Sequence, residues 1–328
     1  MAIYHATCKP ISRGNGHSVT AKAAYIGCKK ITDNRTGNKF DYTRKKGFLG
    51  GGIVLPDGIN LDIDSSELWN RAEESEKRKD ARVGREWEIS LPHELNEEQR
   101  ILLAKAITME IANRYKVACE YALHTPSKDG DQRNFHVHIV STTRKINQDG
   151  TLGDKSDIEL ENKAAVKRGL PTTKQQITDM REVIANITNQ HLSLAGIEER
   201  VSHLSYLDQG IDKVAGIHKG KAVTEMERRG LSTNVGDLHD ASEKVNQEIV
   251  VLKNQIFSDG AELSELQKEI QKAANSAESN TNNGEITNIL SKDNIVKILK
   301  TIEYHDSVFT RDTINRLLSK SFKKYDLF

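Results

Sequence analysis

The chain has 328 residues, enough for one large domain and something smaller, and its formal net charge is only +1. No run approaches the ~18 apolar residues of a membrane-spanning helix, and no basic stretch followed by an apolar core opens the chain, so neither membrane insertion nor export is indicated. The three cysteines have no metal-type spacing and form no even set for disulfides, which favours a reducing, cytoplasmic setting.

Charge is unevenly distributed along the chain. Residues 1–50 hold ten Lys or Arg against two Asp, whereas residues 237–285 hold ten Asp or Glu against four Lys. A basic block of this kind is typical of a polyanion-binding surface, and an ordinary solvated basic surface is the alternative.

The first predicted elements are a strand over Ala2 to Lys9, a basic loop and a short helix. Ser18 is a good N-cap for a helix over residues 19–26 that Gly27 ends. On that helix Lys22 and Tyr25 share a face, which makes Tyr25 a candidate nucleophile, with simple packing as the alternative.

Two later segments read as surface features. The run Gly50-Gly51-Gly52 completes no phosphate-binding motif and is predicted to be a flexible loop. A helix from Ser65 or Ser66 runs into the charged stretch 73–79, which is predicted to be a solvated helical face.

A strand over residues 85–91 has clean alternation. Trp87 and Ile89 take one face, and Glu86 and Glu88 take the other. Asn96 and Gln99 then form a capping box for an amphipathic helix that runs to residue 115.

Two histidines lie at i and i+2 in the strand predicted over residues 135–143. His136 and His138 therefore share one face. His124 ends the preceding strand, 117–123, and turn residues between the two strands predict a hairpin, so His124 falls beside the pair. Three imidazoles suit one metal ion, and a chance His-x-His on a strand is the alternative.

The second half of the chain is predicted to be helical. Helices are expected over 155–168 and 175–194, followed by a long acidic, coiled-coil-like helix over 241–277 that breaks near Asp259-Gly260. With the strands described above, the fold class is α+β: a central, mainly antiparallel sheet flanked by helices, with a helical C-terminal extension.

These residues suit one chemistry. Three neutral imidazoles leave open positions on a divalent ion, which can polarise a phosphoryl oxygen. A tyrosine nucleophile needs a lysine, a metal or a base nearby. Glu86 or Glu88 fits as the partner that orients a ligand histidine, or as the base.

Several motifs in consistent order resemble those of MobA/MobL-type relaxases, which belong to the histidine-hydrophobe-histidine (HUH) endonucleases. They are Met1-Ala-Ile-Tyr-His5 leading into Ser12-Arg13, Ala21-Lys-Ala-Ala-Tyr-Ile26, Arg85-Glu-Trp-Glu-Ile-Ser-Leu-Pro92, His124 with Asn134-Phe-His-Val-His138, and the segment 210–230. The resemblance implies a relaxase domain over 1–235. Charge and composition predict an acidic helical segment over 236–278 and a linker over 279–292. Residues 293–328 resemble the start of the helicase region in TraA-type transfer proteins.

The resemblance implies an enzyme that nicks one DNA strand at a plasmid or integrative-element transfer origin through a reversible 5′-phosphotyrosine. It assigns Tyr25 as nucleophile and His124, His136 and His138 as ligands of Mg²⁺ or Mn²⁺. The expected partners are single-stranded or hairpin DNA at the origin, accessory relaxosome proteins and a type IV coupling protein. Candidate DNA contacts are Arg13, Lys22, Lys29 and Lys30.

Three other functions remain open from the sequence. The first is a rolling-circle replication initiator, although its tyrosine usually follows the histidine strand, whereas Tyr25 precedes it. The second is a non-catalytic DNA-binding remnant, and the third is a small-molecule phosphohydrolase or transferase. The origin sequence, the physiological metal and the oligomeric state cannot be read from the sequence.

Overall fold

A computed structural model describes residues 4–126, 128, 131–217 and 219–279. The chain divides into two compact units, Met1–His203 and Leu204–Phe328. The predicted linker and the segment resembling a helicase start lie outside the described residues from position 280 on. In the described part of the chain, no helix is both long and apolar enough to cross a membrane.

A five-stranded sheet forms the centre of the first unit, and every neighbouring pair in it is antiparallel. This confirms the predicted α+β class with a central antiparallel sheet. In order across the sheet, the strands are β1 (Ala6–Ser12), β5 (Arg82–Leu91), β7 (Phe135–Ser141), β6 (Cys119–His124) and β4 (Phe48–Val54).

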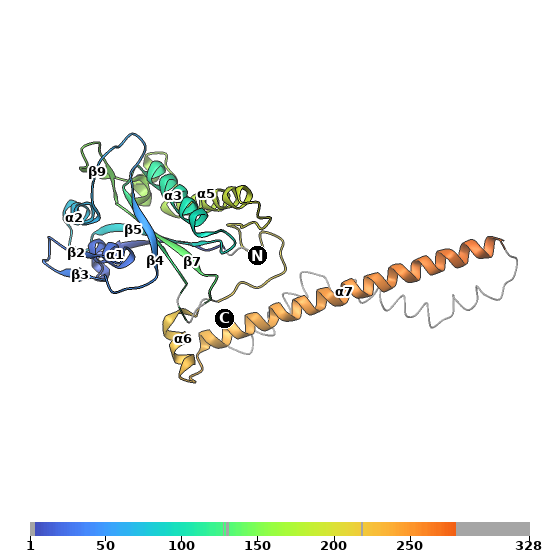
Figure 1. The fold of residues 1–328 in the computed structure, drawn as a ribbon. Coiled ribbons are helices and arrows are strands. Elements are labelled where there is room, and N and C mark those ends of the chain that lie inside the picture. The colour runs from blue at the N-terminus through green and yellow to red at the C-terminus, as the bar shows by residue number, and fades with distance from the viewer. Residues whose placement is uncertain (1–3, 127, 129–130, 218, 280–328) are drawn as a thin grey trace. The chain divides into compact units, whose positions relative to one another are not determined.

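Helices cover both faces of this sheet (Figure 1). α3 (Glu97–Tyr115) and α5 (Thr173–Leu194) pack on the face that carries Trp87 and Ile89. α1 (Val19–Ile26) and α2 (Ser65–Ser75) pack on the opposite face. Each face thus buries its own apolar cluster, and burial of apolar area is the dominant favourable term in folding.

The predicted helix starts are confirmed at both capped positions. The Ser18 hydroxyl accepts from the backbone N–H of Ala21 and begins α1. Asn96 and Gln99 form both hydrogen bonds of a capping box and begin α3. These bonds satisfy amide groups that the first turn of a helix leaves without a helical partner.

The triple glycine was predicted to be a flexible loop, and this prediction is wrong. The three glycines form the middle of strand β4. A Cβ atom at Gly51 would lie 2.2 Å from the carbonyl oxygen of Tyr121 on β6. Only glycine lets the two backbones approach this closely. The glycines are present because β4 and β6 lie too close together for a side chain at Gly51. Glycine content alone does not distinguish such a strand from a loop.

The charged stretch 73–79, which begins in the last turn of α2, is only partly a solvated face, because four of its charged side chains are exposed and two glutamates are buried. Glu73 is fully buried and Glu76 is 7% exposed. Glu73 accepts hydrogen bonds from Arg13, and Glu76 forms ion pairs with Arg144 and Lys155. Burying a carboxylate is costly unless it is paired, and here the partners come from distant parts of the chain.

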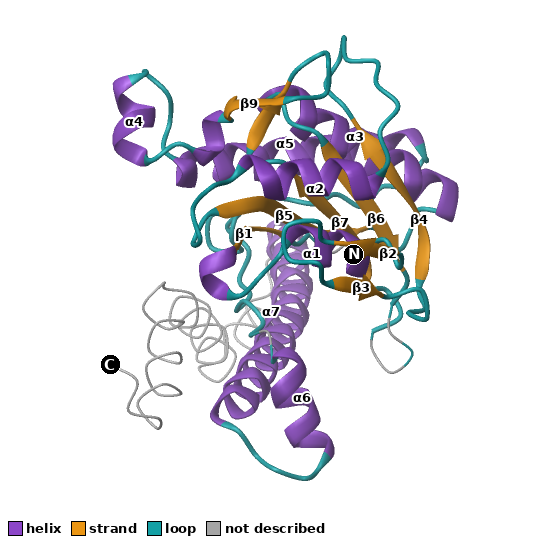
Figure 2. Ribbon diagram, turned by 90° about the vertical axis from the view of Figure 1, so that its left-hand side faces the viewer, coloured by secondary structure: helices purple, strands orange, loops and turns teal. Residues whose placement is uncertain are grey.

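Two other predicted elements differ from the structure. The first strand begins at Ala6 rather than Ala2 and runs on to Ser12. The helix predicted over 155–168 is a strand β9 (Leu152–Lys155), a 3₁₀ turn η2 (Asp157–Glu159) and the short α4 (Asn162–Lys167), which Figure 2 shows set apart from the five-stranded sheet. The remaining elements of this unit are η1 (Arg13–Asn15), β2 (Lys30–Thr32), β3 (Lys39–Asp41) and β8 (Arg144–Ile146).

The described part of the second unit contains α6 (Gly220–Arg228) and the long helix α7 (Asn234–Ser279). The side chain of Asn246 on α7 exchanges hydrogen bonds with both backbone groups of Val214. The break predicted near Asp259-Gly260 is wrong, since α7 continues through it. One glycine in a helix interior costs only about 1 kcal/mol, which the neighbouring turns offset.

Candidate active site

Three histidines from β6 and β7 come together on the face of the sheet that α1 covers. His124 is the register partner of His136, and His138 lies two residues further along β7. Their ring centroids are 5.2–5.7 Å apart. Val137 lies between the two histidines of β7, and Ile139 follows His138. Both side chains point to the opposite face of the sheet and belong to the apolar cluster beneath α3 and α5. The predicted hairpin and shared face are therefore confirmed.

Two of the three rings are held by a hydrogen bond at Nδ1. Nδ1 of His138 lies 2.7 Å from Oε1 of Glu86, and Nδ1 of His136 lies 3.0 Å from the carbonyl oxygen of Asn134. The backbone of Ile26 acts on the His124 ring by raising its pKa against the larger effect of burial. A carbonyl or a carboxylate only accepts, so the ring nitrogen in each bond is the donor, and in a neutral ring the second nitrogen keeps its lone pair.

The histidine cluster comes close to the geometry of a metal site. Nε2 of His124 is buried and has no hydrogen-bond partner among the described residues, which is unusual for a polar atom in a protein interior. Rings that share one ion through nitrogens at ~2.1 Å have centroids about 4.5–5.5 Å apart. The observed spacing is at or just above this range. Within the described ranges, no three His, Cys, Asp or Glu side chains form a closed metal site, so small ring movements are needed to close this one.

The electrostatics favour the ligating form of the histidines. Burial, with the nearby charges of Lys45 and the other two histidines, lowers the pKa of His124 to about 3. Burial also lowers the pKa of His136. Both rings are therefore neutral near pH 7, and a neutral imidazole is the form that binds metal.

Glu86 links the histidines to helix α1. Its carboxylate contacts His138 and also Nζ of Lys22, at 2.6 Å. Burial alone raises the pKa of Glu86, but its hydrogen bonds and charge attraction with His138 and Lys22 lower it to about 2. Glu86 is therefore an anion that two cationic or donor groups hold in place.

Tyr25 lies on α1, three residues after Lys22 and next to Ile26. Its ring meets the edge of the Tyr42 ring, with centroids 5.3 Å apart. Nζ of Lys22 lies 5.8 Å from the Tyr25 ring centroid, and Nζ of Lys45 lies 3.7 Å from it. The helix begins at the Ser18 cap, and its Lys22 pairs with Glu86, which contacts His138 on the sheet.

The second predicted carboxylate, Glu88, lies on the same face of β5. It is the register partner of His138, and its charge raises the pKa of His136 against the larger effect of burial. The hydrogen bond to His138, however, comes from Glu86. The roles of both carboxylates stay predictions.

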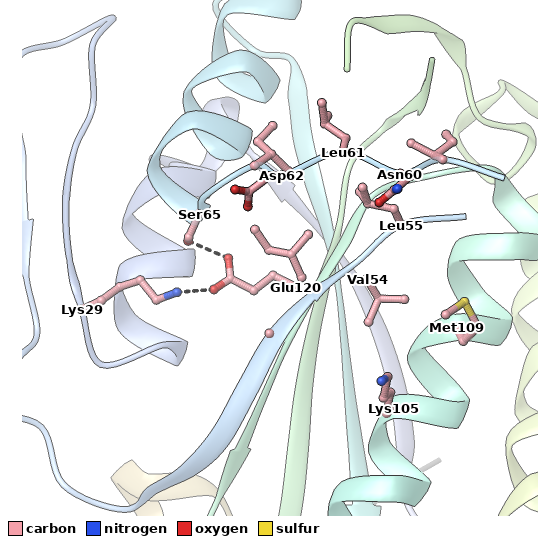
Figure 3. Close-up of a pocket in the computed structure, with 14 residues that line it drawn as sticks. Lys29, Val54, Leu55, Asn60, Leu61, Asp62, Ser65, Lys105, Met109 and Glu120 are labelled. Carbon is pink, nitrogen blue, oxygen red and sulfur yellow. Dashed lines mark hydrogen bonds and ion pairs between the residues drawn. The ribbon is translucent and has the colours of Figure 1, made fainter. Parts of the chain in front are cut away.

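The four cations predicted to contact DNA have different surroundings. Arg13 donates to the buried Glu73, and Lys22 pairs with Glu86. Lys29 reaches Glu120 at the wall of a pocket beside β4 and α2 (Figure 3). Lys30 is exposed at the start of β2. Three of the four thus have carboxylate partners, and their DNA contacts stay predictions.

Two residues of this site carry no signal in the sequence. Lys45 lies in the loop between β3 and β4, where no periodicity marks one lysine among its neighbours Arg44 and Lys46. Asn134 contributes a backbone carbonyl, which no side-chain pattern reveals.

The chain is similar to known transfer proteins. It matches the pattern of the MobA/MobL family over residues 17–229. It is 38% identical over 251 residues to mobilization protein MobL of Acidithiobacillus ferridurans, covering 70% of this chain and 65% of that protein. It is 30% identical over 248 residues to conjugal transfer protein TraA of Agrobacterium fabrum, covering 70% of this chain and 22% of that protein. The chain thus spans less than two thirds of either relative.

The chain is also similar to a solved structure. That structure is described as the molecular basis of vancomycin resistance transfer in Staphylococcus aureus. It shares 27% identity with this chain at a TM-score of 0.52, and the match covers 62% of this chain and 100% of that one. Because the family pattern spans residues 17–229 of 328, well over half of the sequence, the chain belongs to the MobA/MobL family.

Proposed function

We propose that this protein is a relaxase that nicks one DNA strand at the transfer origin of a plasmid or integrative element and so initiates conjugative transfer. The observation that carries the proposal is the meeting of three imidazoles beside the helix that bears Tyr25, whose Lys22 is joined to His138 through Glu86. Such a site suits phosphoryl transfer, in which positioning and charge stabilisation supply most of the catalysis.

His124, His136 and His138 are the proposed ligands of Mg²⁺ or Mn²⁺, which when bound polarises the scissile phosphate as a Lewis acid. Glu86 orients the imidazole of His138 through Nδ1 and strengthens it as a donor. Glu88, on the same face of β5, is the remaining carboxylate for proton transfer. Membership of the family and the free nitrogen of His124 support these assignments.

Tyr25 is the proposed nucleophile. Its phenolic oxygen attacks phosphorus, the bond from phosphorus to the 3′ oxygen breaks, and the phenolic proton is in effect passed to that oxygen. The products are a 5′-phosphotyrosine and a free 3′-hydroxyl. One phosphodiester replaces another, so the step conserves bond energy and can run backwards to rejoin the strand.

The proposed substrate is single-stranded or hairpin DNA at the origin, held by cationic and aromatic side chains. Exposed Lys30 is one such cation, and Arg13, Lys22 and Lys29 are proposed with their carboxylate partners in place. Relaxosome proteins and a coupling protein are proposed as further partners. We also propose that this activity resides in residues 1–235.

A nicking assay tests the proposal. Supercoiled DNA that carries the transfer origin from the same element should become nicked with Mn²⁺ or Mg²⁺ and stay intact with EDTA. Protein should remain attached to the 5′ end. Tyr25→Phe should abolish both nicking and attachment, because the phenylalanine ring lacks the attacking oxygen.

Tyr42→Phe is the matched control, since it removes the hydroxyl of the ring that contacts Tyr25. It should retain nicking. If Tyr42→Phe loses the covalent product while Tyr25→Phe keeps it, the nucleophile is Tyr42. If neither the wild-type protein nor any variant nicks origin DNA, the proposed activity is wrong.

A further inference from the structure

The loop between β3 and β4 brings the ammonium group of Lys45 to Tyr25. Nζ of Lys45 lies over the Tyr25 ring, 3.7 Å from its centroid. The same group donates a hydrogen bond to the backbone carbonyl of Tyr25 at 3.3 Å. Its charge also contributes to the low pKa of His124. One ammonium group therefore acts on both the tyrosine and the histidine cluster.

Two other lysines of this region are neutralised by carboxylates. Lys22 forms an ion pair with Glu86, and Lys29 forms one with Glu120. Within the described residues, Lys45 has no carboxylate within ion-pair distance. A paired lysine contributes little net field, whereas the charge of Lys45 is uncompensated and its side chain is partly buried. In such surroundings a charge acts more strongly than in water.

We propose that Lys45 is a catalytic residue of the strand transfer, an inference that rests on the proposed function of Tyr25. As the bond from the Tyr25 oxygen to phosphorus forms and the bond from phosphorus to the 3′ oxygen breaks, negative charge passes through the tyrosine oxygen and the phosphoryl oxygens. The ammonium group stabilises this charge. The proton of the phenol ends on the 3′ oxygen, and Lys45 keeps its own protons throughout.

The position of Lys45 is suited to this role before DNA binds. Its contacts with the ring and the carbonyl of Tyr25 fix the charge in advance, and a charge that needs no reorganisation stabilises a transition state most effectively. Arg44 and Lys46, on either side, are exposed. They are expected to act on DNA affinity alone.

The test compares Lys45→Met with the matched variant Lys46→Met, which removes the same charge one residue away. The substrate is a single-stranded origin oligonucleotide, with protein and Mn²⁺ at saturating concentrations. The measurements are the first-order rate constant for covalent attachment and, in EDTA, the DNA affinity from fluorescence anisotropy. Lys45→Met should lower the rate constant about 10²–10³-fold, as loss of one preorganised donor does, and should weaken DNA binding no more than Lys46→Met does.

Two further readouts separate catalysis from a structural role. Lys45→Arg keeps a cation that stacks on aromatic rings and should restore most of the lost rate. Lys45→Met should also slow rejoining by the same factor as cleavage, because both directions share one transition state, so the ratio of cleaved to joined strand stays unchanged. Lys45→Gln replaces Lys45→Met in all comparisons if the methionine variant does not fold.

Equal cleavage rates for Lys45→Met and Lys46→Met would overturn the inference. So would a Lys45→Arg variant as slow as Lys45→Met, or a shifted ratio of cleaved to joined strand, since either result points to misplacement of Tyr25. These outcomes all require a wild-type protein that nicks and a Tyr25→Phe variant that does not. Failure of that requirement counts against the proposed function instead.

Discussion

The carboxylate of Glu86 makes the sharpest test of how the histidine cluster is organised. It contacts Nδ1 of His138 at 2.7 Å and Nζ of Lys22 at 2.6 Å. In Glu86→Gln the side-chain shape and an acceptor for His138 remain, but the negative charge is lost. The imidazole becomes a weaker donor to a metal ion, and the charge of Lys22 is no longer compensated.

Both effects disfavour a bound cation. Removing the partner that orients a metal-binding histidine typically costs 10–100-fold in metal affinity, or about 1.4–2.8 kcal/mol at 1.4 kcal/mol per tenfold. The expected change lies toward the upper part of this range, because Glu86 is only 13% exposed and solvent screens the freed Lys22 charge incompletely.

The assay is titration calorimetry with Mn²⁺, followed by nicking at low and saturating Mn²⁺. Nicking by Glu86→Gln should be impaired at low metal and should largely recover at saturation. Glu88→Gln is the matched control on the same face of β5, and it should change Mn²⁺ affinity less, because the bond to His138 comes from Glu86. An unchanged affinity in Glu86→Gln, or a larger loss in Glu88→Gln, would refute the reasoning.

Three further predictions concern stability, measured by urea unfolding. Glu73→Gln should destabilise the protein by about 3–5 kcal/mol, because it leaves the buried guanidinium of Arg13 without its counter-charge. The control Glu74→Gln changes an exposed side chain and should be nearly neutral. Similar losses of stability in both variants would contradict this prediction. Gly51→Ala should cost about 1–3 kcal/mol, since its Cβ would lie 2.2 Å from a carbonyl oxygen of β6, and Gly50→Ala, whose Cβ would meet its nearest neighbour at 4.0 Å, should cost clearly less. Burial raises the pKa of Glu76, but hydrogen bonds from a lysine and an arginine lower it overall. The stabilisation is therefore complete above the unfolded-state pKa of about 4.3 and is lost as the pH falls through the lower folded-state pKa, so the wild-type protein should lose more stability than Glu76→Gln between pH 6 and pH 3.

Part of the basic N-terminal block forms ion pairs inside the fold instead of a free cationic surface. Composition alone predicted a polyanion-binding surface, with an ordinary solvated basic surface as the alternative. In the structure, however, Arg13 and Lys29 pair with carboxylates that are buried in the fold. Glu73 lies 60 residues from Arg13, and Glu120 lies 91 residues from Lys29. No sequence window contains both members of either pair, so their pairing could not be predicted.

Local rules were sufficient wherever a few neighbouring residues determine the structure. Alternation along a strand places His136 and His138 on one face, and the hydroxyl of Ser18 begins the helix that bears Tyr25. The same rule assigns Glu86 and Glu88 to a shared face of β5. Each of these results depends on backbone geometry within one or two turns or on the two-residue period of a strand.

Only the tertiary structure decided which of these side chains meet. Strand register makes Glu88 the partner of His138, yet Glu86 reaches the imidazole and joins it to Lys22. The loop after β3 brings Lys45 over the ring of Tyr25. These contacts depend on strand order, register and the packing of α1 on the sheet, which arise from the burial of two apolar clusters across the whole first unit rather than from any local pattern.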